Sequence, residues 1–461
     1  MKIPRVIIAG EHKPGFVSPS ILLVAAMKRC GIPLRIFYCG YNPIDVCILQ
    51  SVEEELITVI NLKTCINPKM VKTLFETSAK SNSLNVIICD LGARGNTTRD
   101  CYIDATASEL AAILDCSIVL CCYAENNPRP VIKILGDICT TLESKRPNTR
   151  IDGAVFVNPF DQHSFQLFEN NVGINFKWTT FGYIPSELEP PLPSIEAISS
   201  AGSHTRGTFS IQATASRISK LQGQIDYLAL EAIGKYNQEW TPIGGIARFQ
   251  KSNMPKVAIF DNLALTGEGN NAELLFSSFG CQVSYIMAED LLSQNFDMYY
   301  FPDGLGYIAL DYFKKAKNFS ALFKNAIVNN KMVFANGASG LIFGDEFIMP
   351  DGSRAQGLGF FPIIGNYNNS SSPKNPVSVP VPATCTCANT NGRLLQGDER
   401  INGYILPNIG LESNSKSLRC TLTNGDSAGS TGYEENNTII AGLWLDLWSN
   451  VDAIKRLFYT A

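Results

Sequence analysis

Histidine is scarce in this chain, which has three histidines among 461 residues, and none of them lies after Met254. The three are His12, His163 and His204. Histidine is the side chain that most often moves protons in catalysis near neutral pH. The second half of the chain therefore offers no imidazole that could activate a serine or cysteine nucleophile.

Long apolar runs and an excess of charge are also missing. The opening MKIPRVIIAG holds only four consecutive apolar residues before Glu11, whereas a secretory signal needs about 7–15. The most apolar later stretch, residues 118–122, is far shorter than the roughly 20 residues of a membrane span. A net charge of −4 and the lack of basic clusters give no general attraction to nucleic acid. We expect a soluble cytoplasmic protein without a membrane span or a nucleic-acid partner.

Cysteine is present in number, with fourteen residues, but not in the pattern of a disulfide framework. Cys89, Cys116, Cys121 and Cys122 lie in apolar, strand-like runs, where thiols behave as small buried hydrophobes in a reducing compartment. Cys385-Thr386-Cys387 is the one closely spaced pair that we expect to be exposed. No second pair and no nearby histidine completes a ligand set, so the sequence favours neither a metal site nor a redox role there.

The length predicts two domains, because one core rarely exceeds about 250–300 residues. In the first half we expect helices over residues 20–29 and 105–114, and strands over 5–9, 34–38, 86–89, 117–122, 154–157 and 178–184. Short apolar strands separated by helices predict a parallel sheet covered on both faces. The proline-rich segment 185–193 closes this region, and residues 211–236 have the apolar spacing of one long helix.

A second alternating pattern begins at Met254. We expect strands over 256–260, 282–286, 298–301 and 332–335, and helices over 272–279 and 319–329; residues 367–382 are rich in Asn, Ser and Pro and predict a surface loop. The predicted fold class is α/β, with two domains that each carry a mostly parallel sheet flanked by helices. The expected boundaries are a first domain over 1–205, a helical connector over 206–254 and a second domain over 255–461.

Six segments follow one another in an order that resembles a known family. They are GYNPID around Asp45, Asn61-Leu62 followed by Lys63, ASELAAILDCSIVLCCYAE from Ala107, FGYIPSELE from Phe181, SGLIFGDE from Ser339 and GYEENNTIIAGLWLDLW from Gly432. Together they resemble the cobyrinic acid a,c-diamide synthases. The resemblance implies a P-loop NTPase-like ligase domain, similar to dethiobiotin synthetase, joined to a class I glutamine amidotransferase-like domain.

The phosphate-binding loop of that family corresponds to residues 10–18, GEHKPGFVS. An active loop needs glycines, a lysine for the phosphates and a Ser or Thr for magnesium. Val17 stands at the lysine position and Ser18 at the magnesium position, while Pro14 removes a backbone donor. Lys13 could reach a phosphate from elsewhere in the loop. The alternative is an ordinary turn between strand and helix that no longer holds a triphosphate.

Two carboxylates remain candidates near this loop. Asp90 ends a strand where the family has a magnesium-binding glutamate, and Asp45 matches a family aspartate at the end of the second strand. Both would lie at the carboxyl edge of the sheet, where open α/β folds bind ligands. The candidate nucleotide-binding residues are therefore Gly10, Ser18, Asp45 and Asp90, with Ser18 and Asp90 as magnesium ligands only if nucleotide binds. The alternative for each acid is a solvated loop position or a helix cap.

The glutaminase site of the family is interrupted more clearly. The tight turn Phe334–Leu341 keeps small residues, but Ala338, or Gly337 in another alignment, stands where the nucleophilic cysteine belongs. Leu445 and Leu447 stand at the positions of the family's histidines. Ser339 would need a base that the second half lacks. We expect no catalytic residue in this domain.

The leading hypothesis is a pseudoenzyme that acts by binding, as a homodimer, as the partner of an active enzyme or as a carrier of a tetrapyrrole-type ligand. The alternative is an ATP-dependent amide ligase that acts on tetrapyrrole carboxylates with ammonia supplied from outside; only this alternative requires ATP and Mg²⁺. A third possibility is a binding protein for an unrelated small molecule.

Overall fold

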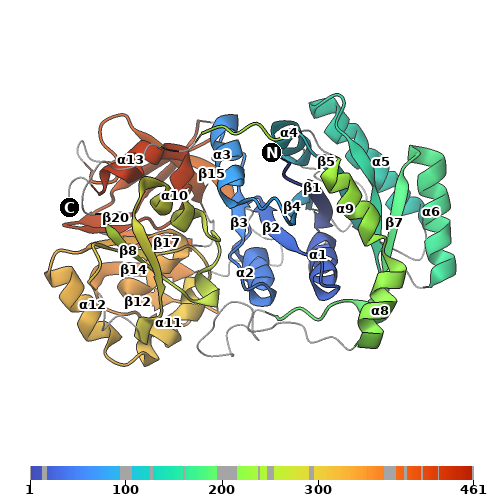
Figure 1. Ribbon diagram of the computed structural model, residues 1–461. Coiled ribbons are helices and arrows are strands. Elements are labelled where there is room, and N and C mark those ends of the chain that lie inside the picture. The colour runs from blue at the N-terminus through green and yellow to red at the C-terminus, as the bar shows by residue number, and fades with distance from the viewer. Residues whose placement is uncertain are drawn as a thin grey trace.

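The structure is a computed structural model that describes residues 2–12, 18–93, 106–124, 128–158, 161–194, 215–236, 239–244, 246, 254–289, 295–349, 351–367, 380–388, 392–405, 409–423 and 425–458. Two α/β halves lie side by side, the first drawn in blue to green and the second in yellow to red (Figure 1). The predicted α/β class is confirmed, since a parallel sheet flanked by helices forms the centre of each half. None of the described helices has the length and apolar character needed to cross a bilayer.

The first half is built on a seven-stranded sheet with the order β3-β2-β4-β1-β5-β6-β7, in which every pairing is parallel. Its strands are β1 (Arg5–His12), β2 (Leu34–Cys39), β3 (Thr58–Ile60), β4 (Leu84–Ala93), β5 (Ser117–Tyr123), β6 (Ile151–Val157) and β7 (Thr179–Ile184). Its helices are α1 (Pro19–Arg29), α2 (Pro43–Val52), α3 (Pro68–Ser78), α4 (Thr106–Leu114), α5 (Pro128–Lys145) and α6 (Gln162–Phe176), with a short 3-10 helix η1 (Ser186–Leu188).

Continuous burial explains why these strands read as unbroken apolar runs. Every residue of β2 and β5 is buried, as expected for a parallel sheet with helices on both faces. Prolines and asparagines then set the starts of the helices between them. Asn42 and Asn67 cap α2 and α3 with their side chains, and a proline occupies the first turn of each helix.

The predicted long helix over 211–236 is wrong in one respect, because it is broken into α8 (Ala215–Gln224) and α9 (Tyr227–Lys235). The Asp226 side chain accepts a hydrogen bond from the Ala229 amide at 2.9 Å and so begins a new helix. Ile225 forms an antiparallel bridge with Gly182 instead of continuing α8. Helix α9 contacts β1 and β4, and α8 contacts β7, so both helices pack on the first sheet. The boundaries at residues 205 and 254 stay a prediction.

The second half has a six-stranded sheet with the order β20-β21-β11-β10-β8-β9, parallel except for the β20–β21 pair. Its strands are β8 (Lys256–Phe260), β9 (Gln282–Ile286), β10 (Met298–Phe301), β11 (Met332–Ala335), β20 (Tyr433–Glu435) and β21 (Thr438–Ile440). The helices are α10 (Asn271–Phe279), α11 (Gly306–Lys315), α12 (Phe319–Val328) and α13 (Val451–Arg456), with 3-10 helices η2 (Leu263–Leu265), η4 (Gly337–Phe343) and η5 (Leu447–Asn450).

Two smaller sheets, which the sequence did not predict, complete the second half. One has the order β13-β12-β14-β17 and the other the order β19-β18-β15-β16-β22. Their strands are β12 (Gly344–Ile348), β13 (Arg354–Gln356), β14 (Phe361–Tyr367), β15 (Val381–Cys387), β16 (Arg400–Ile405), β17 (Ile409–Ser413), β18 (Leu418–Leu422), β19 (Ser427–Thr431) and β22 (Trp444–Leu445). The two ends of the predicted loop over 367–382 therefore belong to β14 and β15, and residues 368–379 lie outside the described residues.

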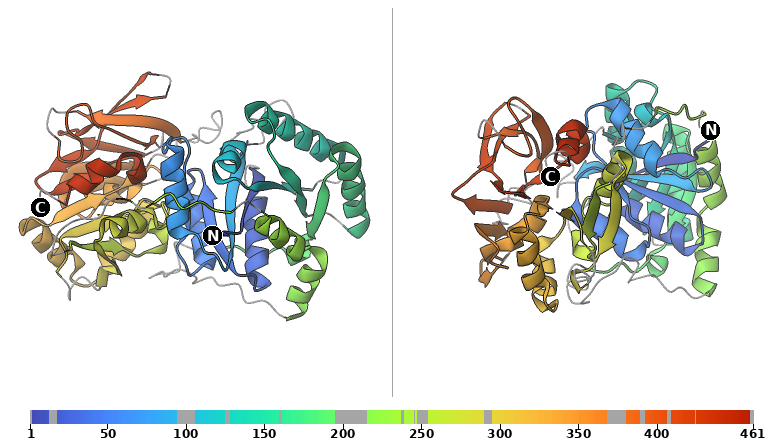
Figure 2. Two further views of the ribbon diagram at one scale, coloured as in Figure 1. Left: turned by 45° about the horizontal axis from the view of Figure 1, so that its top comes forward. Right: turned by 60° about the vertical axis from the view of Figure 1, so that its left-hand side comes forward.

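The two halves share a common packed region. In both further views α2, α3 and β3 are the parts of the first half that lie against the second half (Figure 2). Buried side chains from both halves belong to the same apolar clusters. The junction between the halves is therefore part of the core.

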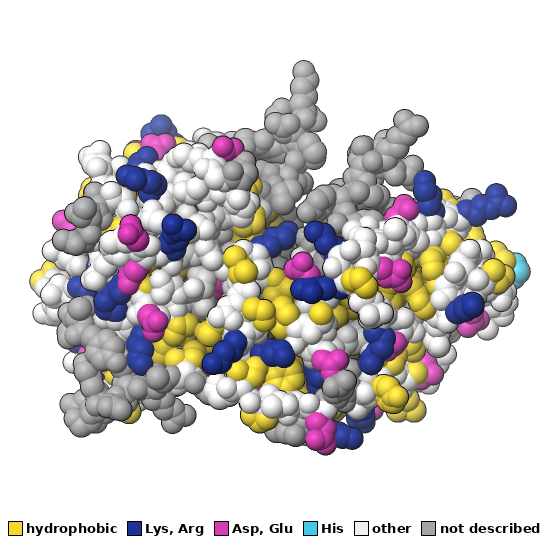
Figure 3. Space-filling view, turned by 90° about the horizontal axis from the view of Figure 1, so that it is seen from above, with side chains coloured by type: hydrophobic (Ala, Val, Ile, Leu, Met, Phe, Trp, Pro, Cys, Tyr) yellow, Lys and Arg dark blue, Asp and Glu magenta, His cyan; other side chains and the backbone are white. Residues whose placement is uncertain are grey.

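On the face drawn in Figure 3, acidic and basic side chains are interspersed with apolar ones, without a large patch of one sign.

Candidate functional site

Three polar side chains meet at the carboxyl edge of the first sheet. Tyr38 lies near the end of β2, Asp45 in the first turn of α2 and Asp90 in β4. The Tyr38 hydroxyl lies 3.2 Å from Asp45 Oδ2 and 3.1 Å from Asp90 Oδ2. Asn42 Nδ2 donates to Asp45 Oδ2 at 2.9 Å. The structure therefore brings the two predicted acids together through a tyrosine.

Burial governs the charge of this acid cluster. Burial first, and then the negative charge of Asp90, raise the pKa of Asp45 to about 7, although hydrogen bonds from Tyr38 and Asn42 act in the opposite direction. Burial and the two carboxylates also hold the pKa of Tyr38 well above its ordinary value. A proton or a cation at this place would relieve the repulsion between Asp45 and Asp90.

Gly10 and Ser18, the other two candidates, lie at the same edge. Gly10 pairs with Asp90 in the register of β1 and β4. A Cβ at position 10 would lie 2.9 Å from Ser18 Oγ and 2.4 Å from Ser20 Oγ, so only glycine fits there. Among the described residues neither hydroxyl has a hydrogen-bond partner, although both are buried. In the loop between Gly10 and Ser18, residues 13–17 lie outside the described residues.

These groups fit magnesium and a nucleotide in part. Magnesium in nucleotide sites is held by one or two oxygen ligands of the protein and by the phosphates, and Ser18 Oγ and a carboxylate of Asp90 are such ligands. No set of three or more His, Cys, Asp or Glu side chains suited to a metal ion occurs in the described part of the chain. If a nucleotide binds, it would supply the activated phosphate, while Ser18 and Asp90 would hold its cation.

The second candidate region is the turn that follows β11. Gly337 has φ +60°, and a Cβ there would lie 1.7 Å from Asp303 Oδ1. The Ala338 amide donates to the same Asp303 oxygen at 2.9 Å. Ser339 Oγ is fully buried, 2.7 Å from the Asn336 carbonyl oxygen and 3.1 Å from that of Phe301. The Ser339 hydroxyl thus faces backbone acceptors and has no base beside it.

Asp303 follows β10 and fills the space in front of this turn. Its Oδ2 atom accepts a hydrogen bond of 2.6 Å from the hydroxyl of Tyr41, which belongs to the first half. The Tyr41 ring stacks on Tyr404 and on Trp444, with a centroid distance of 4.9 Å to each. Burial raises the pKa of Asp303 to about 6, although the hydrogen bonds from Tyr41 and Ala338 oppose this rise.

This arrangement opposes acyl-transfer chemistry at the turn. Such reactions stabilise a developing oxyanion with amide N–H groups that point into the site. The Ala338 amide is already bonded to Asp303, and a carboxylate at that place would repel a second negative charge. Tyr41 covers the other carboxylate oxygen.

Behind the turn lies a buried polar cluster. Asn336 Nδ2 donates to Glu268 Oε2 at 2.7 Å and to the Leu445 carbonyl oxygen at 2.9 Å, and its Oδ1 accepts from the Leu445 amide at 2.8 Å. Tyr300 donates to Glu268 Oε1 at 2.7 Å. Burial raises the pKa of Glu268 to about 8. The cluster ties β22 to the turn.

The positions of the family's histidines are apolar and buried. Leu445 is 0% exposed and Leu447 3%, and both belong to one apolar cluster with Trp448. Of the three histidines, His163 is exposed on α6, His12 lies at the end of β1, and His204 lies outside the described residues. Among the described residues, no histidine lies in the second half.

Sequence reasoning missed Tyr41, Asp303 and Glu268. Two signals could have found Asp303 and Tyr41. Asp303 comes two residues after a strand of the second sheet, so it had to lie at the carboxyl edge beside the small-residue turn. Tyr41 lies in the same GYNPID segment as Asp45. Nothing in the sequence, however, indicates that this segment faces the second half.

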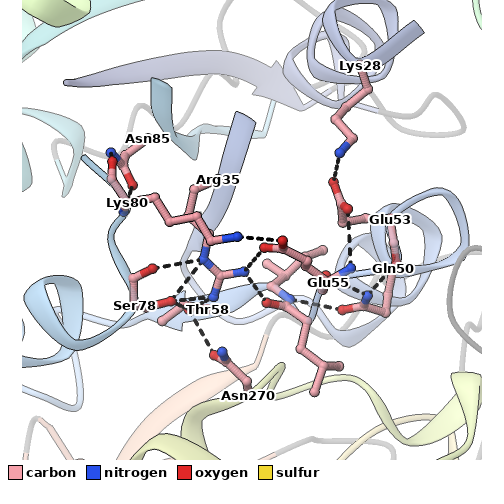
Figure 4. Close-up of polar contacts among 12 residues, drawn as sticks. Lys28, Arg35, Gln50, Glu53, Glu55, Thr58, Ser78, Lys80, Asn85 and Asn270 are labelled. Atoms are coloured by element: carbon pink, nitrogen blue, oxygen red, sulfur yellow. Dashed lines mark hydrogen bonds and ion pairs between the residues drawn. The ribbon is translucent and has the colours of Figure 1, made fainter. Parts of the chain in front are cut away.

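A buried network at the junction surrounds Arg35 of β2 (Figure 4). Its guanidinium donates to the Leu56 carbonyl oxygen at 2.6 Å and to the Ser78 carbonyl oxygen at 3.1 Å. Thr58 Oγ1 lies 2.8 Å from the side-chain amide of Asn270, which belongs to the second half. The Asn271 side chain extends the contact, since it binds both the amide and the carbonyl oxygen of Val59. These bonds fix the position of β3 against α10.

No family model matches the chain, and no curated protein matches it. Solved structures give a weak likeness. A glutamine amidotransferase from Thermotoga maritima is 8% identical over 45% of this chain and 82% of its own, with a TM-score of 0.29. A second glutamine amidotransferase is 10% identical over 44% and 95%, with a TM-score of 0.30. The MinC:MinD cell division complex of Aquifex aeolicus is 11% identical over 39% of this chain and 80% of its own, with a TM-score of 0.26. These values assign neither a family nor an activity.

Proposed function

We propose that the chain is a catalytically degenerate homologue of the cobyrinic acid a,c-diamide synthases that acts by binding. It would serve as a homodimer, as the partner of an active enzyme or as a binder of a tetrapyrrole-type ligand. The main support is the Asp303 carboxylate, which accepts hydrogen bonds from the Ala338 amide and from the Tyr41 hydroxyl. A turn whose amide is occupied and whose own residues, 334–341, include no cysteine or histidine supports a loss of glutaminase chemistry.

Glutamate release from glutamine tests the catalytic part of this proposal. We expect no glutamate above background from purified protein, as measured with coupled glutamate dehydrogenase. The Ser339→Ala variant is the matched control, because it removes the only hydroxyl in the turn. Turnover in the wild type that disappears in this variant would show a serine enzyme and overturn the proposal. Turnover in both proteins would place the active site elsewhere.

Assembly and ligand binding test the second part. We expect sedimentation equilibrium to give a mass above that of one 461-residue chain, or titration with a corrinoid to change the corrinoid's visible spectrum. A strict monomer that leaves the spectrum unchanged would contradict binding of either kind. The same titration with an unrelated aromatic dye controls for unspecific adsorption.

A second candidate function is supported by the acid cluster at the first sheet. Asp45, Asp90 and Ser18 lie at one edge, and this is the place where an ATP-dependent amide ligase would hold magnesium and nucleotide. The position of the missing lysine argues for weak binding, because a charge-assisted contact contributes about 1.5–3 kcal/mol, or roughly one to two powers of ten in affinity.

Calorimetry with MgATP separates the two candidates. We expect no heat of binding at micromolar nucleotide in the wild type. Micromolar binding that is abolished in Ser18→Ala and in Asp90→Asn would favour the ligase instead. Glu143→Gln, exposed near the C-terminal end of α5, is a suitable control substitution that should leave any binding unchanged.

A further inference from the structure

Two buried cysteines face each other in the C-terminal antiparallel sheet. Cys385 lies in β15 and Cys420 in β18, and the register places them directly opposite each other. Their Sγ atoms are 3.2 Å apart. The two residues are 0% and 1% exposed. Neither cysteine takes part in the acid cluster of the first half or in the turn after β11.

The backbone already meets the requirement for a bond between these sulfur atoms. Directly opposed residues of antiparallel strands have Cα atoms about 4.5–5.5 Å apart, and disulfides span about 4.4–6.8 Å. Closing the gap from 3.2 Å to the bonded distance of about 2.05 Å therefore needs side-chain rotation rather than strand movement.

Cys387 is the obvious competitor, and its surroundings differ. The register places Leu418, not a thiol, opposite Cys387. Cys387 Sγ accepts a hydrogen bond of 3.1 Å from the Gly392 amide. Cys387 also lines a cavity of about 530 Å³ together with Arg393 and Arg456. Residues two apart lie on the same face of a strand, so Cys387 and Cys385 share one face of β15, but only Cys387 lines this cavity.

We propose that Cys385 and Cys420 are an oxidisable dithiol that closes to a cross-strand disulfide on reaction with a peroxide. A peroxide such as hydrogen peroxide is small and uncharged, which suits a pair of thiols that are almost fully buried. The bond would join β15 to β18 and close the loop over residues 386–419.

The chemistry balances with the peroxide as the sole oxidant. The Cys420 thiolate attacks one peroxide oxygen and the O–O bond breaks. The leaving hydroxide takes up the proton that the Cys420 thiol released and departs as water. Cys420 is then a sulfenic acid. Cys385 Sγ attacks the Cys420 sulfur, the S–O bond breaks, and hydroxide leaves with the Cys385 proton as a second water. Two thiols lose two electrons, and the peroxide gains them.

The hydrogen bond between the sulfur atoms supports these roles. It lowers the pKa of the Cys420 thiol and raises the pKa of the Cys385 thiol. Thiolates, not thiols, react with peroxides. Cys420 is therefore the nucleophile and Cys385 the thiol that resolves the sulfenic acid.

Mass spectrometry of the full-length chain tests the proposal directly. Reduced protein is treated with hydrogen peroxide, blocked with an alkylating reagent and digested without reductant. We expect a cross-linked pair of peptides that contain Cys385 and Cys420, two fewer alkylated thiols, and reversal by dithiothreitol. Because this readout uses the wild type, it does not depend on how a variant folds. Two thiols that stay alkylatable while Cys387 is oxidised would overturn the proposal, and so would a cross-link from Cys387.

Alanine variants assign the roles. Cys385→Ala should leave Cys420 as a sulfenic acid that dimedone traps, whereas Cys420→Ala should leave Cys385 as a free thiol. Cys387→Ala is the matched control, and it should keep the cross-link. Cys281→Ala removes a buried cysteine that precedes β9 and should also keep the cross-link. Loss of the cross-link in Cys387→Ala alone would show that Cys387 is the reactive residue and refute the assignment.

Discussion

The hydroxyl of Tyr41 donates a hydrogen bond of 2.6 Å to Asp303 Oδ2, and this bond joins the first half of the chain to the turn after β11. Asp303 is 0% exposed, so its carboxylate depends on the donors that the fold supplies. One donor comes from each half, namely Tyr41 from the first and the Ala338 amide from the second. The packing of the halves and the state of the turn are therefore coupled through one side chain.

Tyr41→Phe should lower the free energy of unfolding by about 1–3 kcal/mol, because it removes a donor from a buried carboxylate and keeps the stacked ring. Urea denaturation followed by tryptophan fluorescence measures the change. Tyr285→Phe is the matched control, since Tyr285 donates to Glu273 at 3.0 Å in a partly buried place within the second half. The free energy of unfolding should fall less in Tyr285→Phe than in Tyr41→Phe. Equal costs would show that the junction bond contributes no more than a surface bond.

Gly337→Ala should destabilise the chain more strongly than Gly397→Ala. Both glycines have positive φ, +60° and +55°, so both variants carry backbone strain of about 1–2 kcal/mol. Only at position 337 does the new Cβ meet another atom, at 1.7 Å from Asp303 Oδ1, while nothing lies within 4 Å at position 397. Thermal melting of the two variants isolates the clash. A smaller loss in Gly337→Ala would contradict the described turn.

Stability should fall as pH rises through the neutral range. The folded chain holds the Glu268 proton up to a pKa of about 8, while the ordinary value is 4.5. Unfolding therefore releases a proton between these values, so the contribution is complete below about pH 4.5 and is lost as pH rises through about 8. Because the pKa of Asp303 is raised from 3.8 to about 6, this residue adds to the loss of stability with rising pH between these two values.

Glu268→Gln isolates the Glu268 contribution to this pH dependence. Urea midpoints between pH 5 and 8.5 should decline less steeply in the variant than in the wild type, whose slope from one such group reaches at most about 1.4 kcal/mol per pH unit. Asp303→Asn should flatten only the acidic end of the curve. Parallel curves for wild type and Glu268→Gln would mean that this carboxyl is ionised in the folded state at neutral pH.

Restoring one catalytic residue at the turn should not restore glutaminase activity. Ala338→Cys still lacks a base, and Leu445→His still lacks a nucleophile, because the two groups act as a unit. Asp303 would also remain against the amide of residue 338. The coupled glutamate assay, with added glutaminase as a positive control, measures this. Sustained turnover in Ala338→Cys alone would mean that another group near the turn serves as the base.

Most strands of the two parallel sheets could be predicted because they are short apolar runs, among which β2, β5 and β10 are fully buried. Strands β2, β5, β8 and β10 lie within one or two residues of the expected ranges. The antiparallel strands were not predicted because polar, small and apolar residues are mixed within them. Strand β19, Ser427–Thr431, has no large apolar side chain, and four of its five residues are exposed. The break at Ile225 escaped since the apolar spacing continues through Asp226, whose capping role depends on the contact with Gly182.

The site was predicted to the extent that it follows from chain order. Asp90 lies in β4, and Asp45 lies in the first turn of the helix that follows the neighbouring strand β2, so their meeting at one edge required only the parallel sheet. Tyr38 between them and Asp303 against Ala338 required side-chain directions that no spacing gives. The buried Glu268 depends on Tyr300 and Asn336, which lie 32 and 68 residues away along the chain.

The last part of the chain also completes the first half. Thr64 donates to Asp446 Oδ2 at 2.6 Å, and its carbonyl oxygen accepts from Asn402 Nδ2 at 2.8 Å. Asn61 Oδ1 accepts from the Tyr404 hydroxyl at 3.1 Å. During synthesis the segment after β3 emerges from the ribosome long before these partners do. The nascent first half must therefore wait, with these polar groups bonded to water, until the chain has been made to residue 446, and a product that stops earlier would keep them exposed.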